Sequence, residues 1–369
     1  MKKLGFGLMR LPLIDPENHK AVDMSQFCEM VDVFLERGFT YFDTAYMYHD
    51  GMSESLMKEA LVDRYPREKY TITTKLPTFF LKEVGDQERI FEEQIQRCGV
   101  EFFDYYLLHN LGEENYKTAK KFGSFEFVSK LKERGLVRHI GFSFHDNAQV
   151  LDRILTEHPE IEFVQLQINY LDWNDPVVQS RLCYETALKH GKKIIVMEPV
   201  KGGRLANVPY KVRDILSEKH PQWSPAAWAI KFAASLPSVV MVLSGMSNLA
   251  QLNENTCFMH DFQNLDSHDI AVLRRAEAML RAEAVIPCTN CRYCTEGCPK
   301  IIPIPEYFRI YNESLLSKDV ADKSQEKLKE IAGKGGGRLE DCINCKQCER
   351  ACPQHLEITN YLTKIKNMF

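Results

Sequence analysis

The chain has 369 residues, of which 44% are hydrophobic and 27% are charged, and its net charge is −4. This composition is typical of a globular protein, and the small negative charge gives no electrostatic reason to expect nucleic acid or an anionic membrane as a partner. Lys2 and Lys3 precede a short apolar run that Arg10 interrupts, which excludes a signal-peptide core or a membrane span there. We therefore expect a cytoplasmic protein, with room for one large domain and a small one or for two ordinary domains.

Between residues 4 and about 259, short β-type runs alternate with amphipathic helical runs. The strand candidates are 4–9, 40–42, 70–75, 104–108, 139–142, 163–168, 193–197 and 239–243, and the helix candidates between them are 25–37, 53–63, 85–97, 124–133, 148–157, 177–190 and 225–234. Such alternation requires parallel strands joined by helical crossovers. Eight units in about 250 residues is the size of a closed (β/α)8 TIM barrel. An open doubly wound sheet is the alternative on pattern alone.

The pattern changes near residue 262. Residues 266–283 form a helical run rich in Ala, Leu and Arg, and Pro287 breaks the helical pattern. We therefore expect a barrel at 1–262, a linking helix at 263–286 and a small, mostly α cysteine-rich domain at 287–369, with helices near 305–317 and 323–331. Too few residues precede the first strand candidate to form a β-hairpin across the bottom of the barrel. Another part of the chain must therefore close this end, and the C-terminal extension is one candidate.

Eight of the 12 cysteines fall into two compact groups near the C-terminus. The groups are Cys288-x2-Cys291-x2-Cys294-x3-Cys298-Pro and Cys342-x2-Cys345-x2-Cys348-x3-Cys352-Pro. In a reducing cytoplasm such grouping indicates metal binding, and this spacing is the bacterial ferredoxin run, present twice. We expect two [4Fe–4S] clusters with crossed ligands: Cys288, Cys291, Cys294 and Cys352 on the first, and Cys342, Cys345, Cys348 and Cys298 on the second. Two structural zinc sites are the alternative.

Polar residues stand at the ends of three consecutive strand candidates: Asp43 with Tyr48 five residues beyond it, Lys75, and His109. These strand ends form the face where a (β/α)8 barrel carries its chemistry. Tyr48 is the candidate proton donor, although a free phenol has a pKa of about 10. Lys75, paired with Asp43, would lower that pKa, and His109 could hydrogen-bond a carbonyl oxygen. Tyr46 is a second phenol nearby.

The order Asp43, Tyr48, Lys75, His109 resembles the catalytic tetrad of the aldo/keto reductases. The resemblance implies a nicotinamide cofactor, NADP or NAD, and a small carbonyl or alcohol substrate. It assigns Gly7, Met9 and Arg10, after the first strand, to the nicotinamide pocket. The other cofactor contacts it implies are Ser143 and Gln165 at the carboxamide, Pro199, Lys201, Gly202, Gly203 and Arg204 at the pyrophosphate, and Gly245, Ser247, Gln251, Glu254 and Asn255 at the adenosine phosphate.

This sequence departs from the family pattern at several cofactor positions. Phe144 stands where the family has Asn beside Ser143, with His145 following it, and Met197 and Glu198 stand where an aromatic residue commonly stacks on the nicotinamide. Gly245 and Gln251 occupy places where many members carry Lys and Arg, so the preference between NADP and NAD is open. The pocket loops, expected at 77–85 and 110–123, show no charge pattern that selects a substrate.

The two halves of the chain handle electrons differently, because a nicotinamide transfers two at once and a [4Fe–4S] cluster takes one. A flavin could mediate between them, but the sequence has no clear flavin signature. We expect an oxidoreductase that acts on a carbonyl or alcohol through the tetrad, with two clusters for electron transfer. The alternative is an electron-transfer protein whose clusters serve a redox partner, the barrel being a secondary or sensory nicotinamide site.

Overall fold

The barrel predicted from the sequence is confirmed. The computed structural model describes residues 2–15, 18–282, 285–314, 327–328, 330–331 and 336–368. Eight parallel strands pair in chain order and close, with β8 beside β1. They are β1 (Leu4–Gly7), β2 (Tyr41–Asp43), β3 (Thr71–Leu76), β4 (Phe103–Leu111), β5 (Val137–Phe144), β6 (Phe163–Gln167), β7 (Lys193–Met197) and β8 (Val239–Ser244).

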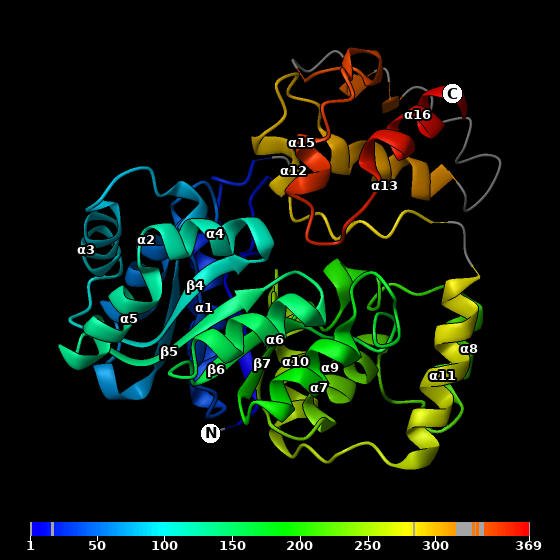
Figure 1. Ribbon diagram of the computed structural model, residues 1–369. Helices are drawn as coiled ribbons and strands as arrows, with labels where there is room; N and C mark the ends of the chain where they lie inside the picture. The colour runs from blue at the N-terminus through cyan, green and yellow to red at the C-terminus, as the bar shows by residue number, and fades with distance from the viewer. Residues whose placement is uncertain are drawn as a thin grey trace.

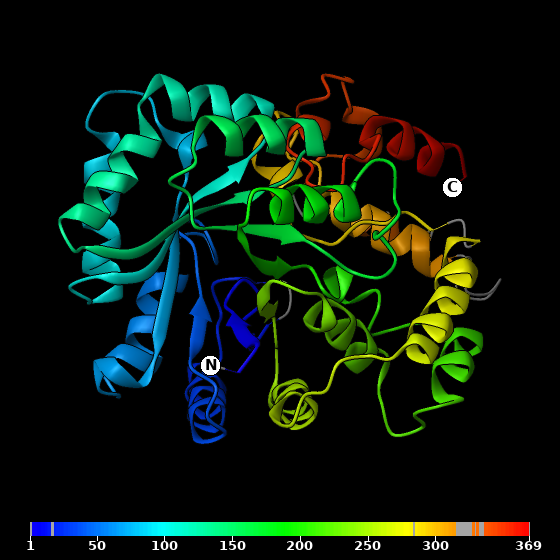
Figure 2. The ribbon, with the colours of Figure 1, turned by 60° about the horizontal axis from the view of Figure 1, so that its bottom comes forward.

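Helices cover the outside of the barrel (Figures 1 and 2). They are α1 (Met24–Glu36), α2 (Ser53–Met57) with the π-type turn η1 (Lys58–Val62), α3 (Asp86–Cys98), α4 (Glu113–Lys121), α5 (Ser124–Glu133), α6 (Ala148–Glu157), α7 (Ser180–Lys189), α8 (Tyr210–Ser217), α9 (Pro225–Ser235), α10 (Leu249–His260) and α11 (Ser267–Arg281). Short 3-10 turns are η2 (Arg67–Lys69), η3 (Thr78–Phe80) and η4 (Lys201–Gly203). α11 lies beside α8, on the flank of the barrel (Figure 1).

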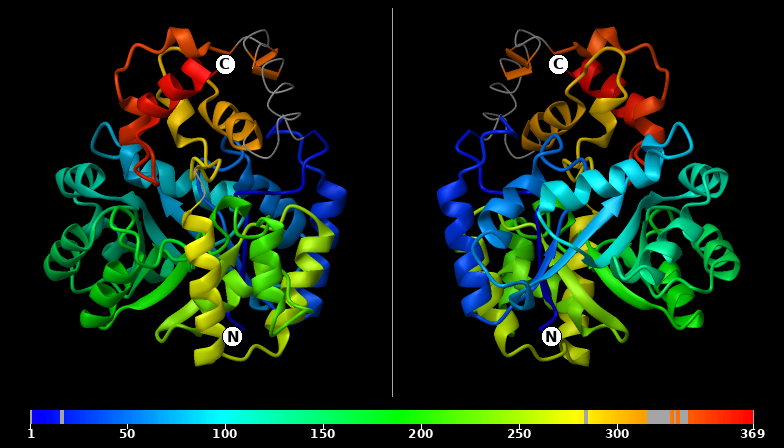
Figure 3. Two further views of the ribbon diagram at one scale, coloured as in Figure 1. Left: turned by 90° about the vertical axis from the view of Figure 1, so that its right-hand side faces the viewer. Right: turned by 90° about the vertical axis from the view of Figure 1, so that its left-hand side faces the viewer.

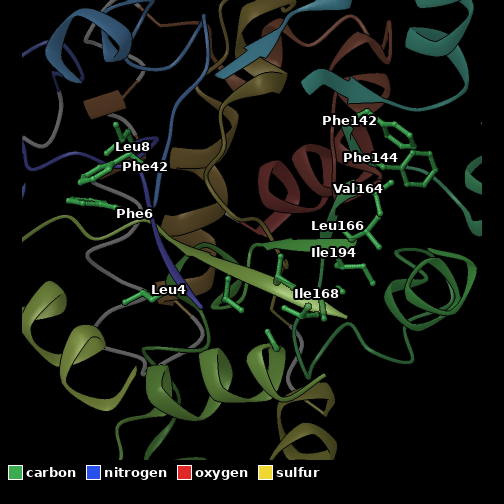
Figure 4. Close-up of a cluster of buried hydrophobic side chains, with 14 of the residues drawn as sticks. Leu4, Phe6, Leu8, Phe42, Phe142, Phe144, Val164, Leu166, Ile168 and Ile194 are labelled. Carbon is green, nitrogen blue, oxygen red and sulfur yellow. The ribbon is translucent and has the colours of Figure 1, made fainter. Parts of the chain in front are cut away.

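Two layers of buried side chains hold the barrel. Outward-facing residues such as Phe6, Phe42 and Phe142 pack under the helices (Figure 4). Inside the barrel, Tyr41 packs on Tyr105, which contacts Phe163, with ring centroids 5.3 and 5.2 Å apart. Because side chains alternate across a strand, the same strands carry Asp43, His109 and Gln165 in register further toward their C-terminal ends.

The C-terminal extension does not close the bottom of the barrel. In Figures 1 and 3 the extension lies at the end opposite the N-terminus, over the C-terminal ends of the strands. The expectation of a bottom closure by this extension is therefore wrong. The aromatic layer of Tyr41, Tyr105 and Phe163 fills the barrel interior instead.

The C-terminal unit has a hydrophobic core of its own, which includes Ile304, Tyr307 and Phe308. Its elements are α12 (Tyr293–Glu296), α13 (Ile304–Ser314), the 3-10 turn η5 (Leu339–Asp341), α15 (Gln347–Arg350) and α16 (Ile358–Met368). The helix expected at 323–331 falls largely outside the described residues. Within the described part of the chain, no helix combines the length and the apolar character needed to cross a membrane.

Candidate active site

The structure brings the four predicted strand-end residues together. Asp43 ends β2, Lys75 lies in β3 and His109 in β4, and Tyr48 follows β2. Lys75 Nζ lies 2.6 Å from Asp43 Oδ1 and 3.5 Å from the Tyr48 hydroxyl, and it also donates to the Thr44 carbonyl at 2.7 Å. The arrangement places a phenol, an ammonium group, a carboxylate and an imidazole at one end of the barrel.

Burial dominates the ionisation of this group. It raises the pKa of Asp43 and lowers that of Lys75, and the contact between the two opposes both shifts. Burial also raises the pKa of Tyr48, with Asp43 adding to the shift and Arg10 opposing it, and it lowers the pKa of His109 well below its usual range. The expected lowering of the Tyr48 pKa by Lys75 is therefore wrong, because burial and Asp43 raise this pKa. Tyr48 keeps its proton, and His109 is neutral.

Hydrogen bonds from neighbouring elements fix these side chains. Gln165 Nε2 donates to Asp43 Oδ2 at 3.2 Å, and Gln94 of α3 donates to the Lys75 carbonyl at 3.1 Å. Tyr46 turns away from the group, since its hydroxyl donates to Glu93 on α3 at 2.6 Å. The geometry therefore separates the two phenols that the sequence offers, and it directs Tyr48 to the site.

A cavity lies above these residues. Several predicted cofactor residues line it together with Asp43, Tyr48 and His109: Gly7, Met9, Arg10, Ser143, Gln165 and Gly245. The cavity shares Arg10, Tyr48 and Tyr293 with a wider cavity, which also borders Ser247 and the segments 47–50 and 290–293. The wider cavity thus adjoins the tetrad side of the barrel.

The C-terminal unit supplies one wall of the tetrad cavity, which the sequence analysis did not predict. Thr289, Cys291, Tyr293 and Gln354 line it, and the Tyr293 hydroxyl lies 3.4 Å from His109 Nε2. The sequence does contain one difference between the two cysteine groups that could have pointed to this contact. The first has Arg-Tyr between its second and third cysteines, whereas the second has Lys-Gln.

Four buried polar atoms of the cavity lining have no hydrogen-bond partner within the described structure: His109 Nδ1, His145 Nδ1, Glu198 Oε2 and Thr289 Oγ1. Buried polar atoms are usually paired, so this lining suits a ligand that carries polar groups. His145 faces the cavity, whereas Phe144, at the family's Asn position, is buried in the hydrophobic core (Figure 4). Ser143 Oγ accepts from the Asn110 amide at 2.7 Å.

The loop after β7 is engaged with other parts of the chain. Lys201 is buried and donates to both carboxylate oxygens of Asp172, at 2.7 and 2.6 Å, and to Gln354 Oε1 at 3.0 Å. Arg204 donates to the Leu280 carbonyl of α11 at 3.4 Å. Gly202 has a φ of +63°, and a Cβ there would lie 2.5 Å from the Thr289 carbonyl oxygen. Lys201 thus contacts the C-terminal unit, and Arg204 contacts α11.

The remaining predicted cofactor residues lie around these loops. Pro199 and Gly203 belong to the β7 loop, and no atom lies within 4 Å of a Cβ built on Gly203. At the start of α10, the Gln251 side chain accepts from the Ser247 amide at 2.8 Å, and Asn255 donates to Ser244 Oγ at 3.0 Å. Glu254 is exposed on α10.

The cysteines line two separate cavities in the C-terminal unit. Cys288, Cys291, Cys294 and Cys352 line one, and Cys342, Cys345, Cys348 and Cys298 line the other. Each set combines three cysteines of one group with the fourth of the other.

The two cysteine loops also share a backbone conformation. Asn290 and Arg292 have positive φ angles, as do Asn344 and Lys346 at the equivalent positions of the second group. Zinc would draw four thiolates to within about 2.3 Å of a single ion. Among the described residues, no group of three or more Cys, His, Asp or Glu side chains is arranged to hold a single metal ion. The cysteines of each set therefore line a cavity without converging on a single point.

Comparison with known proteins agrees with this geometry. Residues 3–278 match the sequence model of the aldo/keto reductase family, and residues 287–357 match that of the 4Fe-4S dicluster domain. The chain is 25% identical to 9,11-endoperoxide prostaglandin H2 reductase of Trypanosoma cruzi over 252 residues, which cover 67% of this chain and 82% of that protein. It is 26% identical to human aldo-keto reductase family 1 member C4 over 301 residues, 74% of this chain and 87% of that protein.

Solved structures share the barrel fold. The holo form of an aldo-keto reductase from Bacillus halodurans aligns with a TM-score of 0.59 at 22% identity, covering 74% of this chain and 91% of that one. An aldo/keto reductase from Klebsiella pneumoniae in complex with NADP and acetate aligns with a TM-score of 0.57 at 18% identity, covering 74% and 90%. The family match spans most of the chain, and an iron–sulfur domain follows it. The chain belongs to the aldo/keto reductase family of oxidoreductases.

Proposed function

We propose that the protein is an NADP(H)-linked oxidoreductase that interconverts a small carbonyl compound and its alcohol through Asp43, Tyr48, Lys75 and His109. The observation that carries this proposal is the convergence of Asp43, Tyr48 and His109 on one cavity whose wall includes Ser143 and Gln165, with Lys75 in contact with Asp43 and 3.5 Å from the Tyr48 hydroxyl. A bound nicotinamide would supply or accept the hydride. The residues of the chain would orient the substrate and move its proton.

Each member of the tetrad has a role that its surroundings support. Tyr48 keeps its proton and can donate it to a carbonyl oxygen. Lys75, fixed by Asp43 and the Thr44 carbonyl, holds a positive charge beside the phenol and stabilises negative charge as it develops. Neutral His109 can hydrogen-bond the same oxygen. General acid catalysis of this kind typically contributes about 100- to 10,000-fold to the rate.

The cofactor would bind across the strand ends. Ser143 and Gln165 would hold its carboxamide, and Arg10, which lines both cavities, would pair with the pyrophosphate. Gly202 and Gly203 would contribute backbone, and the start of α10 the adenosine site. NADP is the proposed cofactor because a structural neighbour contains it, and the uncharged Gly245 and Gln251 keep NAD as an alternative.

We further propose that the two cysteine cavities each hold a [4Fe–4S] cluster, a cofactor that exchanges single electrons. Four cysteines line each cavity, and this number supports the assignment. One observation favours the alternative function, an electron-transfer protein with a redox partner. The tetrad cavity and the first cysteine cavity share Thr289, Cys291 and Gln354 as lining residues. Grouped cysteines suit a reducing compartment such as the cytoplasm.

The test uses protein purified without oxygen, with its iron content verified. We expect NADPH to be consumed in the presence of one or more members of a panel of small aldehydes and ketones. Tyr48→Phe should abolish this turnover while NADPH binding and iron content stay unchanged. Tyr46→Phe is the matched control and should retain activity, because its hydroxyl contacts Glu93 outside the cavity. Equal activity in wild type and Tyr48→Phe would refute the tetrad assignment.

A further inference from the structure

The tetrad cavity and the first cysteine cavity meet at a thin wall. Thr289, Cys291 and Gln354 line both, so one layer of residues separates the two spaces. The second cysteine cavity shares no lining residue with the tetrad cavity. A charge that enters the tetrad cavity therefore lies close to the first cysteine group and farther from the second.

Arg10 connects the two sites. It follows β1, borders the tetrad cavity and donates from Nη2 to the Thr289 carbonyl at 2.7 Å. Thr289 is the neighbour of Cys288. The same Nη2 lies 3.9 Å from Glu198 Oε1, beyond hydrogen-bond distance. The guanidinium thus places a positive charge against the cysteine loop, and Glu198 compensates it at a longer distance.

We propose that cofactor binding in the tetrad cavity and the redox state of the first cluster are coupled, and that Arg10 carries the coupling. This inference rests on the proposed function, because it takes the pyrophosphate as the group that Arg10 receives. A doubly charged pyrophosphate offers Arg10 a stronger partner than a neutral carbonyl. The bound anion then neutralises the positive charge at the Thr289 loop.

The direction of the effect follows from charge. Adding an electron makes the first cluster site more negative, and Arg10 favours that change while it contacts Thr289. An anionic ligand that neutralises Arg10 disfavours it. The coupling is reciprocal, so the ligand must bind less tightly to the reduced protein by the same factor. A tenfold difference in affinity corresponds to a shift of about 59 mV for a one-electron couple.

The probe is 2′-phospho-ADP-ribose, which keeps the phosphates of NADP but lacks the ring that exchanges hydride. The midpoint potential of each cluster is measured by titration followed by electron paramagnetic resonance, with and without saturating probe, on the full-length protein. We expect the first cluster to shift about 59 mV more negative, equivalent to tenfold weaker probe binding to the reduced protein. The second cluster is the internal control and should move much less.

Two variants separate Arg10 from a general charge effect. Arg10→Gln removes the contact with Thr289, and at saturating probe its first cluster should show no shift. Lys20→Gln is the matched control, because Lys20 is an exposed cation on the wider cavity. It should retain the wild-type shift. A shift that persists in Arg10→Gln would overturn the role of Arg10.

The remaining outcomes distinguish this inference from the proposed function. If NADPH, followed by its fluorescence, does not bind the oxidised protein, both fail. If NADPH binds but the probe does not, or if the probe binds and the first cluster keeps its potential, the coupling alone is overturned.

Discussion

Lys201 forms a buried ion pair with Asp172 and donates to Gln354 of the C-terminal unit, and its replacement by Met should destabilise the protein strongly. The side chains of Lys201 and Asp172 are 3% and 5% exposed, and their closest atoms lie 2.6 Å apart. Removing one partner of a buried ion pair typically costs about 3–5 kcal/mol. Gln167 and Asn169 still donate to Asp172, at 3.1 and 2.8 Å, so we expect a cost near the lower limit, about 3 kcal/mol.

The assay is urea unfolding without oxygen, followed by tryptophan fluorescence, with the double variant Lys201→Met/Asp172→Asn as the control. The double variant removes the unpaired carboxylate of Asp172 and keeps the shape of that side chain. It should therefore recover most of the lost free energy of unfolding. If the single variant loses less than about 1 kcal/mol of unfolding free energy, the level of an exposed ion pair, the importance of the buried ion pair is refuted. A double variant no more stable than the single one would do the same.

Three further predictions concern the clusters, the loss of stability at acidic pH and the contact between the barrel and the C-terminal unit. Cys352→Ser should remove the resonance signal of the first cluster and spare that of the second, and loss confined to the second would exclude crossed ligation. Burial, with a smaller contribution from His355, lowers the pKa of His145 from 6.5 to about 3, so the unfolded chain binds a proton that the folded one does not. Stability should therefore fall as the pH drops from about 6.5 toward 3, and His145→Gln should flatten this slope in pH-dependent unfolding. Gly202→Ala, whose methyl group meets the Thr289 carbonyl, should speed hydrogen exchange at the 288–294 loop, whereas Gly203→Ala shares the positive φ without the clash and should not.

The barrel, and the position of Asp43, Lys75 and His109 at one end of its strands, could be predicted because both follow from local pattern. Each strand and its terminal polar residue lie within a few positions of one another, as with β2 and Asp43. The spacing also predicts the sets of four cysteines that share each cavity. The expectation of a loop at 110–123 is wrong, because helix α4 occupies most of it; Glu113 and Glu114 in its first turn and Lys120 and Lys121 in its last complement the helix dipole.

The roles of the β7 loop and of the C-terminal unit could not be predicted, because they depend on docking. Lys201 resembles a phosphate ligand in sequence, and its partner Gln354 lies 153 positions away. Tyr293 reaches His109 across 184 positions. Such contacts arise where the barrel packs against the C-terminal unit, and the residue pattern within either unit does not predict them.

The measurement that tests the central claim most directly is the fate of the hydride. NADPH carrying deuterium at both C4 positions is mixed without oxygen with the protein and the best carbonyl substrate of the panel, and the alcohol is analysed by mass spectrometry. Direct transfer in the tetrad cavity predicts one deuterium on the carbinol carbon of the product. An alcohol without deuterium would show that electrons reach the substrate separately from the hydride, and it would contradict this account.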